Sequence, residues 1–582
     1  MSRSPRFRRF AALASATLIA VAVVAPGVSA KPPPGSPAED KAKTTKIQIL
    51  GLNDFHGQLE PVPATSSGGR IGTTPAGGVE YLATHVRALR ATNPNTLFVS
   101  AGDLIGATPL ISAVFHDEPS IEAFNLMDLD YNGVGNHEFD EGVAELLRMQ
   151  NGGCHPVDGC LDGNGFRGAR FGFLAANVVR ADSGRTLFKP YAIRKFRGIK
   201  VGFIGMTLEG TPDIVSPSGV AGLEFLDEAE TANRYARELR RRHGVRAVVV
   251  LLHEGGFQSL PGGINDCEGI SGPIVDIVER TTHRVDLFIT GHTHSAYDCV
   301  IEGRPVTSAS SFGRLFTDID VTLDRRSRDV VKVETENHIV TQDVLKATDI
   351  SDLIARYTTI AAPLRDRVIG RIAADITRTA DDSGENAAGN LIADAQLAAS
   401  SAPDTGAAVA AFMNPGGVRA EFLFAQSGTE GDGNVTYGEA FTVQPFGNSL
   451  VTLTLTGAQV LEMLKQQWCT QDFARVLLPS AGVSYTYSLS AATGLLGQPC
   501  EGAANPVSNL TIGGVAVDPA ASYRITVNSF LADGGDKFTV LAAGADRLGG
   551  AVDTDALEDY IAPSLTGAPV APPALDRINV VP

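Results

Sequence analysis

Short apolar runs recur through the first half of the chain, and each one ends in a polar cluster. Their length and their content of Val, Ile and Leu indicate buried strands. Helical stretches such as Val79–Arg90 and Glu228–Arg242 lie between the runs. The alternation predicts an α/β fold assembled from βαβ units. The clearest runs are Ile47–Leu52, Thr96–Ser100, Ala247–Leu252 and Val285–Thr290.

The pattern changes near residue 343, after strand-like stretches at Thr317–Leu323 and Val330–His338. Asp349–Val368 is typical of a helix that connects two bodies, and a new series begins with helical Asn386–Ser400 and strand-like Val451–Thr456. A chain of 582 residues is also too long for a single core. We predict a first domain over 44–343, a linker helix over 344–368, a second domain over 369–565 and a tail over 566–582.

The N-terminus is typical of an export signal. A cluster of arginines (Arg3, Arg6, Arg8 and Arg9) precedes the apolar run Ala11–Ala25, and Val28-Ser29-Ala30 fits a cleavage site. We predict a signal peptide over 1–30, a flexible leader over 31–43 and a secreted protein with no transmembrane anchor after cleavage. An uncleaved membrane anchor is the alternative.

Charge and cysteine content limit which binding surfaces and cross-links the protein can have. The formal net charge of −17 argues against a basic surface for nucleic acid, so an anionic substrate must be attracted locally. The even number of cysteines in an exported chain suggests disulfides. Fifteen pairings are formally possible, and proximity favours Cys154–Cys160, Cys267–Cys299 and Cys469–Cys500.

The polar clusters that follow the apolar runs contain the candidate metal ligands. In α/β folds, ligands gather at the carboxyl ends of the strands, and these side chains all stand at such ends. A mixture of carboxylates, imidazoles and one amide suits Zn²⁺, Mn²⁺ or Co²⁺, and seven donors fit two ions if one carboxylate bridges them. The candidates are Asp54, His56, Asp103, Asn136, His253, His292 and His294.

The stretch Gly135-Asn136-His137-Glu138-Phe139-Asp140 carries a second type of chemistry. An imidazole three residues before a carboxylate can be oriented by it as an acid/base group or a charge stabiliser, so His137 and Asp140 are candidate catalytic residues. The alternative is a polar loop in which Asp140 caps the helix predicted over Gly142–Met149.

These motifs resemble those of the secreted 5′-nucleotidase family, whose first domain is a calcineurin-like metallophosphoesterase. The resemblance rests on Asn53-Asp-Phe-His-Gly57, Gly102-Asp103, Gly135-Asn-His-Glu-Phe-Asp140, His253, Gly291-His-Thr-His294 and Asn414-Pro-Gly-Gly-Val-Arg419. It implies a β-sandwich flanked by helices, a connecting helix and an α+β C-terminal domain. It also implies that Asp54, His56, Asp103 and His294 hold one ion, that Asp103, Asn136, His253 and His292 hold the other, and that His137 and Asp140 form a catalytic dyad.

The same resemblance places the nucleotide on the C-terminal domain. It implies that Phe446 and Phe530 sandwich the base, that Asp536 binds the ribose, and that Asn414 lies near the base. Gly417 and Arg419 belong to a glycine turn followed by a guanidinium suited to phosphate. The family carries further phosphate-binding arginines before the helix that begins near Asn386. This chain offers Arg378 and Arg371 there, while the nearer positions are acidic.

The expected function is therefore that of a dimetal phosphohydrolase. Its expected substrates are nucleoside 5′-monophosphates, with di- and triphosphates or UDP-sugars as further candidates. The alternatives are a 2′,3′-cyclic-nucleotide 2′-phosphodiesterase with 3′-nucleotidase activity and, in another class, an inactive nucleotide-binding surface protein. Thiosulfate-ester hydrolysis is a weaker option.

Several polar residues fall outside these motifs. The loop Cys154–Asn164 contains Asp158, Asp162 and Asn164, but it lacks the twelve-residue calcium pattern and is expected to be a disulfide-closed surface loop. The remaining histidines are expected to be ordinary surface or core residues. They are His85, His116, His155, His243, His283 and His338.

Overall fold

The computed structural model describes residues 43–62, 70–216, 218–259 and 261–582. The predicted signal peptide and nearly all of the predicted leader lie outside these residues. Among the described residues, no helix is both long enough and apolar enough to cross a membrane.

The first sheet of the N-terminal half has the strand order β14-β13-β1-β2-β3-β4. β1, β2, β3 and β4 run parallel to one another, and β13 pairs antiparallel with β1 and β14. The common chain direction that βαβ units impose on these strands brings the carboxyl ends of β1, β2 and β3 to one edge of the sheet. The bounds are β1 Thr44–Leu52, β2 Thr96–Ser100, β3 Tyr131–Gly133, β4 Gly172–Leu174, β13 Leu315–Asp324 and β14 Val330–Ile339.

The second sheet has the order β11-β12-β10-β9-β7-β6. Its central strands β7, β9, β10 and β12 are parallel, and β6 and β11 are antiparallel strands at its two edges. Every residue of β9 and β10 is buried, as expected for strands covered on both faces. The bounds are β6 Tyr191–Phe196, β7 Ile199–Thr207, β9 Ala247–His253, β10 Leu287–Thr290, β11 Ala296–Ile301 and β12 Arg304–Ala309.

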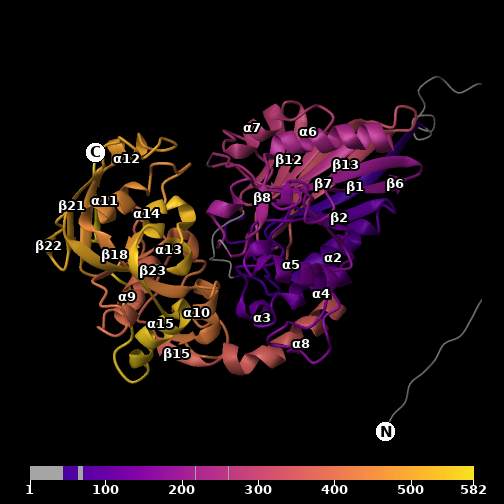
Figure 1. The fold of residues 1–582 in the computed structure, drawn as a ribbon. Helices are drawn as coiled ribbons and strands as arrows, with labels where there is room; N and C mark the ends of the chain where they lie inside the picture. The colour runs from indigo at the N-terminus through magenta and orange to yellow at the C-terminus, as the bar shows by residue number, and fades with distance from the viewer. Residues whose placement is uncertain (1–42, 63–69, 217, 260) are drawn as a thin grey trace, which may run out of the picture. The chain divides into compact units, whose positions relative to one another are not determined.

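The two sheets pack face to face and are flanked by helices (Figure 1). Between the sheets lies a core to which β1 contributes Ile47 and Ile49 and to which β9 contributes Val249 and Leu251. The outer face of the first sheet packs on α2, α4 and α5, and that of the second sheet packs on α6 and α7. This is the β-sandwich that the family resemblance implied. The helices are α2 Val79–Arg90, α3 Leu110–Ala113, α4 Glu118–Leu126, α5 Gly142–Asn151, α6 Glu228–Glu238 and α7 Pro273–Arg280; a small β5–β8 pair joins Val178–Arg180 to Leu223–Phe225.

The connecting helix, α8, spans Thr348–Arg365. Ile350, Leu353, Tyr357 and Ala361 lie on one face of α8 and pack into the core beneath the first sheet. This spacing of three to four residues is that of a single apolar helical stripe. The connecting helix is therefore anchored on the N-terminal domain.

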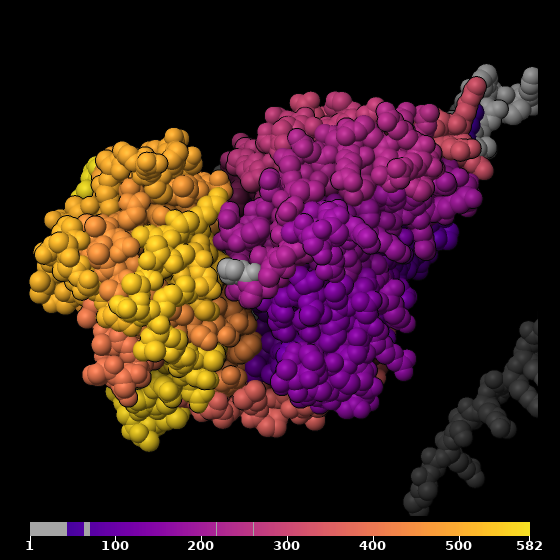
Figure 2. Space-filling model, in the orientation of Figure 1, coloured from indigo at the N-terminus to yellow at the C-terminus, as the bar shows by residue number. Residues whose placement is uncertain are grey.

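The C-terminal residues, orange to yellow in Figures 1 and 2, form a mixed α+β domain. One sheet has the order β19-β16-β23-β18-β24, another β22-β21-β20-β25, and β15 pairs with β17. The strands are β15 Val368–Arg371, β16 Ala410–Met413, β17 Asn434–Thr436, β18 Ser449–Thr456, β19 Leu478–Pro479, β20 Val483–Ser488, β21 Val507–Ile512, β22 Val515–Ala516, β23 Ser522–Asn528, β24 Ala545–Val552 and β25 Ile578–Val581. The helices are α9 Ala387–Ser400, α10 Tyr437–Val443, α11 Gly457–Lys465, α12 Leu489–Thr493, α13 Ser529–Ala532, α14 Thr539–Ala542 and α15 Asp553–Ile561.

The end of the chain differs from the prediction. The segment 566–582, expected to be a tail, contributes β25, which pairs in parallel with β20, and its Ile578 is buried in the domain core. The Pro- and Ala-rich composition of 566–575 hid this short strand, because four residues carry too little periodicity to be recognised.

All three disulfides favoured by proximity are present: Cys154–Cys160, Cys267–Cys299 and Cys469–Cys500. Each lies within one of the two domains. The pairing prediction is confirmed.

Candidate metal centre and active site

The seven predicted ligands meet at the carboxyl edge of the sandwich. Asp54 and His56 follow β1, Asp103 follows β2 and Asn136 follows β3, whereas His253 ends β9 and His292 and His294 follow β10. Both sheets therefore contribute donors to one centre. The carboxyl ends of parallel strands point to the same edge, which explains why residues so distant in sequence converge.

The backbone bends sharply at most of these positions. Five of the seven candidates have a positive φ between 49° and 70°, which is uncommon for residues other than glycine. Backbone strain of this kind is tolerated where the surrounding fold fixes it, and it clusters at functional sites. The five residues are Asp54, His56, Asp103, His292 and His294.

Asp103 lies at the middle of the set. Its Oδ2 is 2.9 Å from His253 Nε2 and 3.7 Å from His56 Nε2. Asp54 lies on the other side, with Oδ1 3.3 Å from His294 Nε2. The geometry suits Asp103 as a bridging carboxylate.

The outer nitrogens of two imidazoles are held by backbone carbonyls. His56 Nδ1 lies 2.8 Å from the Gly106 carbonyl oxygen, and His253 Nδ1 lies 2.7 Å from that of Ala101. A carbonyl oxygen only accepts, so each Nδ1 carries the proton and each Nε2 is left with its lone pair facing the centre. This outer-shell arrangement fixes the tautomer that a metal-bound histidine needs.

The inward-facing atoms fit cations. His253 Nε2 is buried, and its approach to Asp103 Oδ2 at 2.9 Å does not have the geometry of a hydrogen bond. His56 Nε2 faces His294 Nε2 at 3.0 Å, and Asn136 Oδ1 faces His292 Nδ1 at the same distance. Crowded nitrogen and oxygen donors with two buried carboxylates are the composition of a site for borderline divalent ions.

The predicted dyad is also formed. His137 opens a short 3₁₀ turn, His137–Phe139, which folds Asp140 back so that its Oδ2 lies 2.7 Å from His137 Nδ1. Burial opposes a charged imidazole, but the carboxylates of Asp140 and Asp103 outweigh it and raise the pKa of His137 above its ordinary value. Asp140 is not the N-cap of α5, because Glu141 occupies that position.

Glu138 is a central residue for which the sequence reasoning assigned no role. Its buried carboxylate accepts hydrogen bonds from the backbone amides of Asp103, Leu104 and Gly135 and from Asn132 Nδ2. It thereby ties the loop after β2 to the loop after β3. Its place inside the Gly135–Asp140 motif was the signal that could have identified it.

On the C-terminal domain, four side chains form a largely buried polar network, two of them predicted and two not. Asn414 Nδ2 donates to Asp536 Oδ2 at 2.9 Å, and Asn528 Nδ2 donates to Asn414 Oδ1 at 2.9 Å. Arg475 Nη1 lies 2.7 Å from Asp536 Oδ1. Arg475 and Asn528 were not predicted, because neither lies in a recognisable motif.

Arg419 and Phe446 approach the metal centre. The Phe446 ring stacks on the His137 imidazole, with centroids 5.8 Å apart and planes at 19°. The Arg419 guanidinium lies 5.7 Å from the Phe446 centroid. Burial and the neighbouring Arg378 lower the pKa of Arg419, and the carboxylates of Asp103, Asp140 and Asp54 act in the opposite direction.

The remaining predicted substrate residues differ in which parts of the C-terminal domain they contact. Arg378 lies beside Arg419 and donates to its carbonyl oxygen at 3.0 Å, whereas Arg371 bonds to Ser564 and Gly567 within the domain. Gly417 leaves room for Met413 and Asn414, since a Cβ there would lie 2.4 Å from Met413 Cε and 2.9 Å from Asn414 Oδ1. A Cβ on Gly535 would lie 2.4 Å from the Phe530 ring, so this ring packs directly on the backbone before Asp536.

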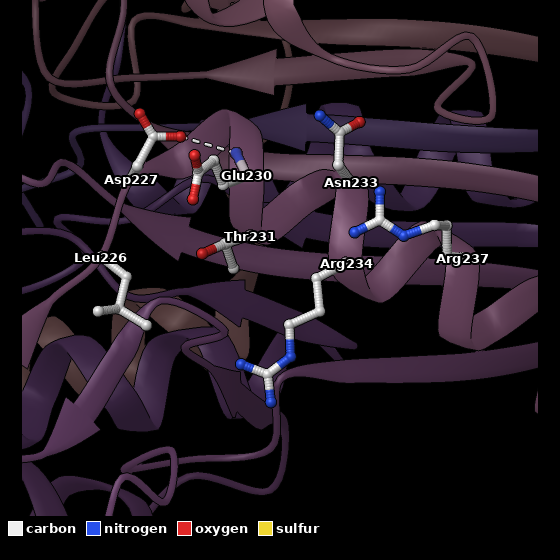
Figure 3. Close-up of a pocket in the computed structure, with 7 residues that line it drawn as sticks. All are labelled: Leu226, Asp227, Glu230, Thr231, Asn233, Arg234 and Arg237. Atoms are coloured by element: carbon white, nitrogen blue, oxygen red, sulfur yellow. Dashed lines mark hydrogen bonds between the residues drawn. The ribbon is translucent and has the colours of Figure 1, made fainter.

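A separate hollow of about 510 Å³ runs along α6 (Figure 3). It is lined by Leu226, Asp227, Glu230, Thr231, Asn233, Arg234 and Arg237. Asp227 caps α6 by accepting from the Glu230 amide, and none of the predicted site residues lines this hollow. The hollow therefore belongs to the surface around α6 and is separate from the predicted site residues.

Together, the sandwich, the donor cluster and the second domain define a two-domain metallophosphoesterase. The model of the calcineurin-like phosphoesterase family matches residues 47–296, and that of the 5′-nucleotidase C-terminal domain matches residues 368–543. The chain belongs to the 5′-nucleotidase family of metallophosphoesterases.

Two curated relatives match most of the chain. Endonuclease YhcR of Bacillus subtilis is 30% identical over 88% of the chain, and cell wall protein Lmo0130 of Listeria monocytogenes is 30% identical over 87%. The chain spans only 39% of the first and 65% of the second.

A solved structure agrees over nearly its full length. The 5′-nucleotidase precursor of Thermus thermophilus is 27% identical, with a TM-score of 0.73 over 92% of this chain and 99% of that one. The fold therefore agrees with that of the 5′-nucleotidase precursor across both domains.

Proposed function

We propose that this protein hydrolyses nucleoside 5′-monophosphates to nucleoside and phosphate with two divalent ions, Zn²⁺, Mn²⁺ or Co²⁺. The observation that carries the proposal is the meeting of seven donors with a His–Asp dyad and with Arg419 of the second domain. A donor cluster alone would support a metal site. The added dyad and guanidinium favour chemistry on a phosphate ester.

Asp54, His56, Asp103 and His294 would hold one ion, and Asp103, Asn136, His253 and His292 the other. When bound, such a pair supplies charge neutralisation for the phosphoryl oxygens and an activated water for in-line attack. Glu138 positions the loops that carry Asp103 and Asn136, since it accepts from the backbone amides of Asp103 in one loop and of Gly135 in the other.

The dyad and the arginines act on the substrate. Asp140 keeps the His137 ring oriented and stabilises its protonated form, so that Nε2 can donate to a phosphoryl oxygen as negative charge develops. Arg419, with Arg378 beside it, adds a second positive group for the same oxygens.

The C-terminal network would bind the nucleoside. Asp536 is acceptor-only when ionised and suits ribose hydroxyls, while Arg475 and Asn414 fix its orientation. Asn414 and the rings of Phe446 and Phe530 supply the base contacts that the family resemblance implies. Diphosphates, triphosphates and UDP-sugars are further candidate substrates of the same site.

A phosphate-release panel tests the proposal. We expect metal-loaded protein to release phosphate from 5′-AMP faster than from 3′-AMP or 2′,3′-cyclic AMP, and to lose activity on chelation. Preference for the cyclic substrate would favour the 2′,3′-cyclic phosphodiesterase alternative. Binding of 5′-AMP without any turnover would favour the inactive nucleotide-binding alternative.

We further propose that the protein is exported by cleavage after Ala30. The three disulfides support an oxidising compartment. N-terminal sequencing of protein recovered from culture medium should begin at Lys31. An intact Met1 terminus on membrane-bound protein would instead favour the uncleaved anchor.

A further inference from the structure

Asp117 is a buried carboxylate that has no role in the mechanism described above. It is the residue directly before α4. An aspartate at that position usually caps its own helix by accepting from a backbone amide of the first turn. The Asp117 side chain makes no such bond to α4. Its carboxylate is directed to another part of the chain.

The carboxylate binds the loop that follows β2. Asp117 Oδ2 accepts from the Gly106 backbone amide at 3.0 Å, and Asp117 Oδ1 accepts from Ser112 Oγ of α3 at 2.7 Å. Ser112 Oγ also lies 2.9 Å from Ser120 Oγ in the first turn of α4. This chain of polar contacts ties Gly106 to both helices.

Gly106 is in turn a direct neighbour of the candidate metal centre. Its carbonyl oxygen lies 2.8 Å from His56 Nδ1, the contact that leaves His56 Nε2 facing the centre. A Cβ on Gly106 would lie 2.5 Å from the His137 carbonyl oxygen and 2.9 Å from Asp140 Oδ2. The Gly106 backbone therefore packs between a candidate ligand and the dyad, and a shift of Gly106 would disturb one or the other.

The backbone is strained on both sides of the contact between Asp117 and Gly106. Ala107 has a φ of 51°, and His116 and Asp117 have φ values of 50° and 61°. Such values are uncommon for residues other than glycine, and they persist only where the surrounding structure fixes them. The hydrogen bond between Asp117 and Gly106 joins the two strained segments.

We propose that Asp117 is a positioning residue for the candidate metal centre: it holds Gly106 so that the Gly106 carbonyl sets the tautomer and orientation of His56. This role rests on the proposed function, because it presupposes that His56 binds an ion. Asp117 is not one of the seven candidate ligands. It acts through two hydrogen bonds in series, one between Asp117 and Gly106 and one between Gly106 and His56.

The ionisation of Asp117 suits these contacts. Burial raises the pKa of Asp117 to about 6, while the hydrogen bonds from Ser112, Gly106 and Thr108 act in the opposite direction. The side chain is therefore ionised at pH 8. An ionised carboxylate offers only acceptors, which matches the two donors that face it.

Two substitutions separate loss of the acceptor from loss of the backbone conformation. Asp117→Gly removes the carboxylate, and glycine adopts a φ of 61° without strain. Asp117→Asn keeps an acceptor oxygen for the Gly106 amide, and its Nδ2 can donate to Ser112 Oγ. Asp128→Gly is the matched control, because Asp128 is an exposed aspartate with a φ of 54° just beyond the other end of α4.

The measurement is the zinc affinity of the full-length protein at pH 8, obtained by competition with a chromophoric chelator. We expect Asp117→Gly to weaken one zinc-binding step by about tenfold, the lower end of the range for outer-shell partners of a metal site, because a second hydrogen bond separates Asp117 from His56. Asp117→Asn and Asp128→Gly should bind zinc as wild type does.

Urea unfolding with chelator present separates positioning from stability, since a merely structural role would lower the stability of Asp117→Gly and leave its zinc affinity unchanged. Equal zinc affinity in wild type and folded Asp117→Gly would overturn the role of Asp117, and so would an equal loss in Asp128→Gly. Ser112→Ala, which removes the donor to Oδ1, replaces Asp117→Gly if that variant does not fold, and unchanged affinity there would have the same meaning. Wild-type protein that binds no zinc would instead remove the proposed metal centre.

Discussion

At the scale of single residues, the candidate metal centre depends on Glu138, which is not itself one of the seven candidate ligands. Glu138 satisfies three backbone amides on two loops, and those loops carry Asp103 and Asn136. Buried amides left without an acceptor cost free energy, so the loops cannot hold this shape without a carboxylate there.

We therefore predict that Glu138→Gln lowers metal affinity by about 10- to 100-fold, the range for outer-shell partners of a metal site. The amide keeps the size of the side chain but replaces one acceptor oxygen with a donor. Competition with a chromophoric chelator measures the change. Glu224→Gln, an exposed position on β8, is the control; equal affinities in the two variants would rule out the positioning role.

The metal-free protein should show a stability change from His116. Its pKa is raised to about 9 mainly by the Glu141 hydrogen bond, while the unfolded value is about 6.5. The stabilisation is then complete below pH 6.5 and is lost as the pH rises through about 9.

Urea unfolding with chelator present, from pH 6 to 10, measures this effect as the difference between wild type and His116→Asn. Asparagine is chosen because His116 has a φ of 50°, which Asn tolerates. The difference should shrink towards high pH. A difference that stays constant would show that the imidazole charge contributes nothing.

At the scale of elements, loops rather than strands decide the chemistry. β9 and β10 supply a rigid buried frame, and short turns after them aim His292 and His294 inward. Disulfides fix other loops, and their contributions should differ with loop length.

Removing Cys469–Cys500 should destabilise the protein more than removing Cys154–Cys160. The sequence separations are 31 and 6, and loop-closure entropy in the chain model gives a difference of about 1.5 kcal/mol. Double alanine variants compared by urea unfolding, in chelator to exclude metal effects, give the measurement. The reverse order would show that native contacts outweigh chain entropy.

The turn after β23 should govern nucleoside binding. Phe530 packs on Gly535 beside the Asp536 network, and base stacking is worth about 1–3 kcal/mol. Phe530→Ala should raise KM for 5′-AMP by about 5- to 150-fold and leave p-nitrophenyl phosphate hydrolysis nearly unchanged. Phe424→Ala, an exposed ring of the same domain, should change neither; equal loss of both activities in Phe530→Ala would make that ring structural.

At the scale of the whole molecule, the site is complete only when both domains contribute. Arg419 belongs to the C-terminal domain, yet the carboxylates of Asp103, Asp140 and Asp54 act on its charge. Phe446 also belongs to the C-terminal domain, and its ring stacks on His137 of the N-terminal domain. A substrate bound at this centre would therefore contact groups from both domains.

Arg419→Ala should lower kcat/KM by about 10²- to 10³-fold for 5′-AMP and for p-nitrophenyl phosphate alike, since a phosphate-directed charge serves any ester. Arg237→Ala, in the hollow along α6, should leave both unchanged. Loss confined to 5′-AMP would place Arg419 on the nucleoside side of the site. Steady-state kinetics on both substrates separates these outcomes.

The sequence by itself predicted the candidate donor set and the order of the two domains, and it indicated the disulfide pairing that the structure confirms. Asp54, Asp103 and His253 could be found because each follows an apolar run, and parallel strands bring such ends together whatever the rest of the fold does. Cysteine pairing followed from proximity along the chain.

Only the tertiary structure decided contacts between segments that share no motif. Arg475 reaches Asp536, Glu138 links two loops, and His116 stacks on His155. A single side chain has no periodicity, so its partner is fixed by how helices and loops pack in three dimensions. For the same reason the sequence did not reveal β25. This short strand is defined by its pairing with β20.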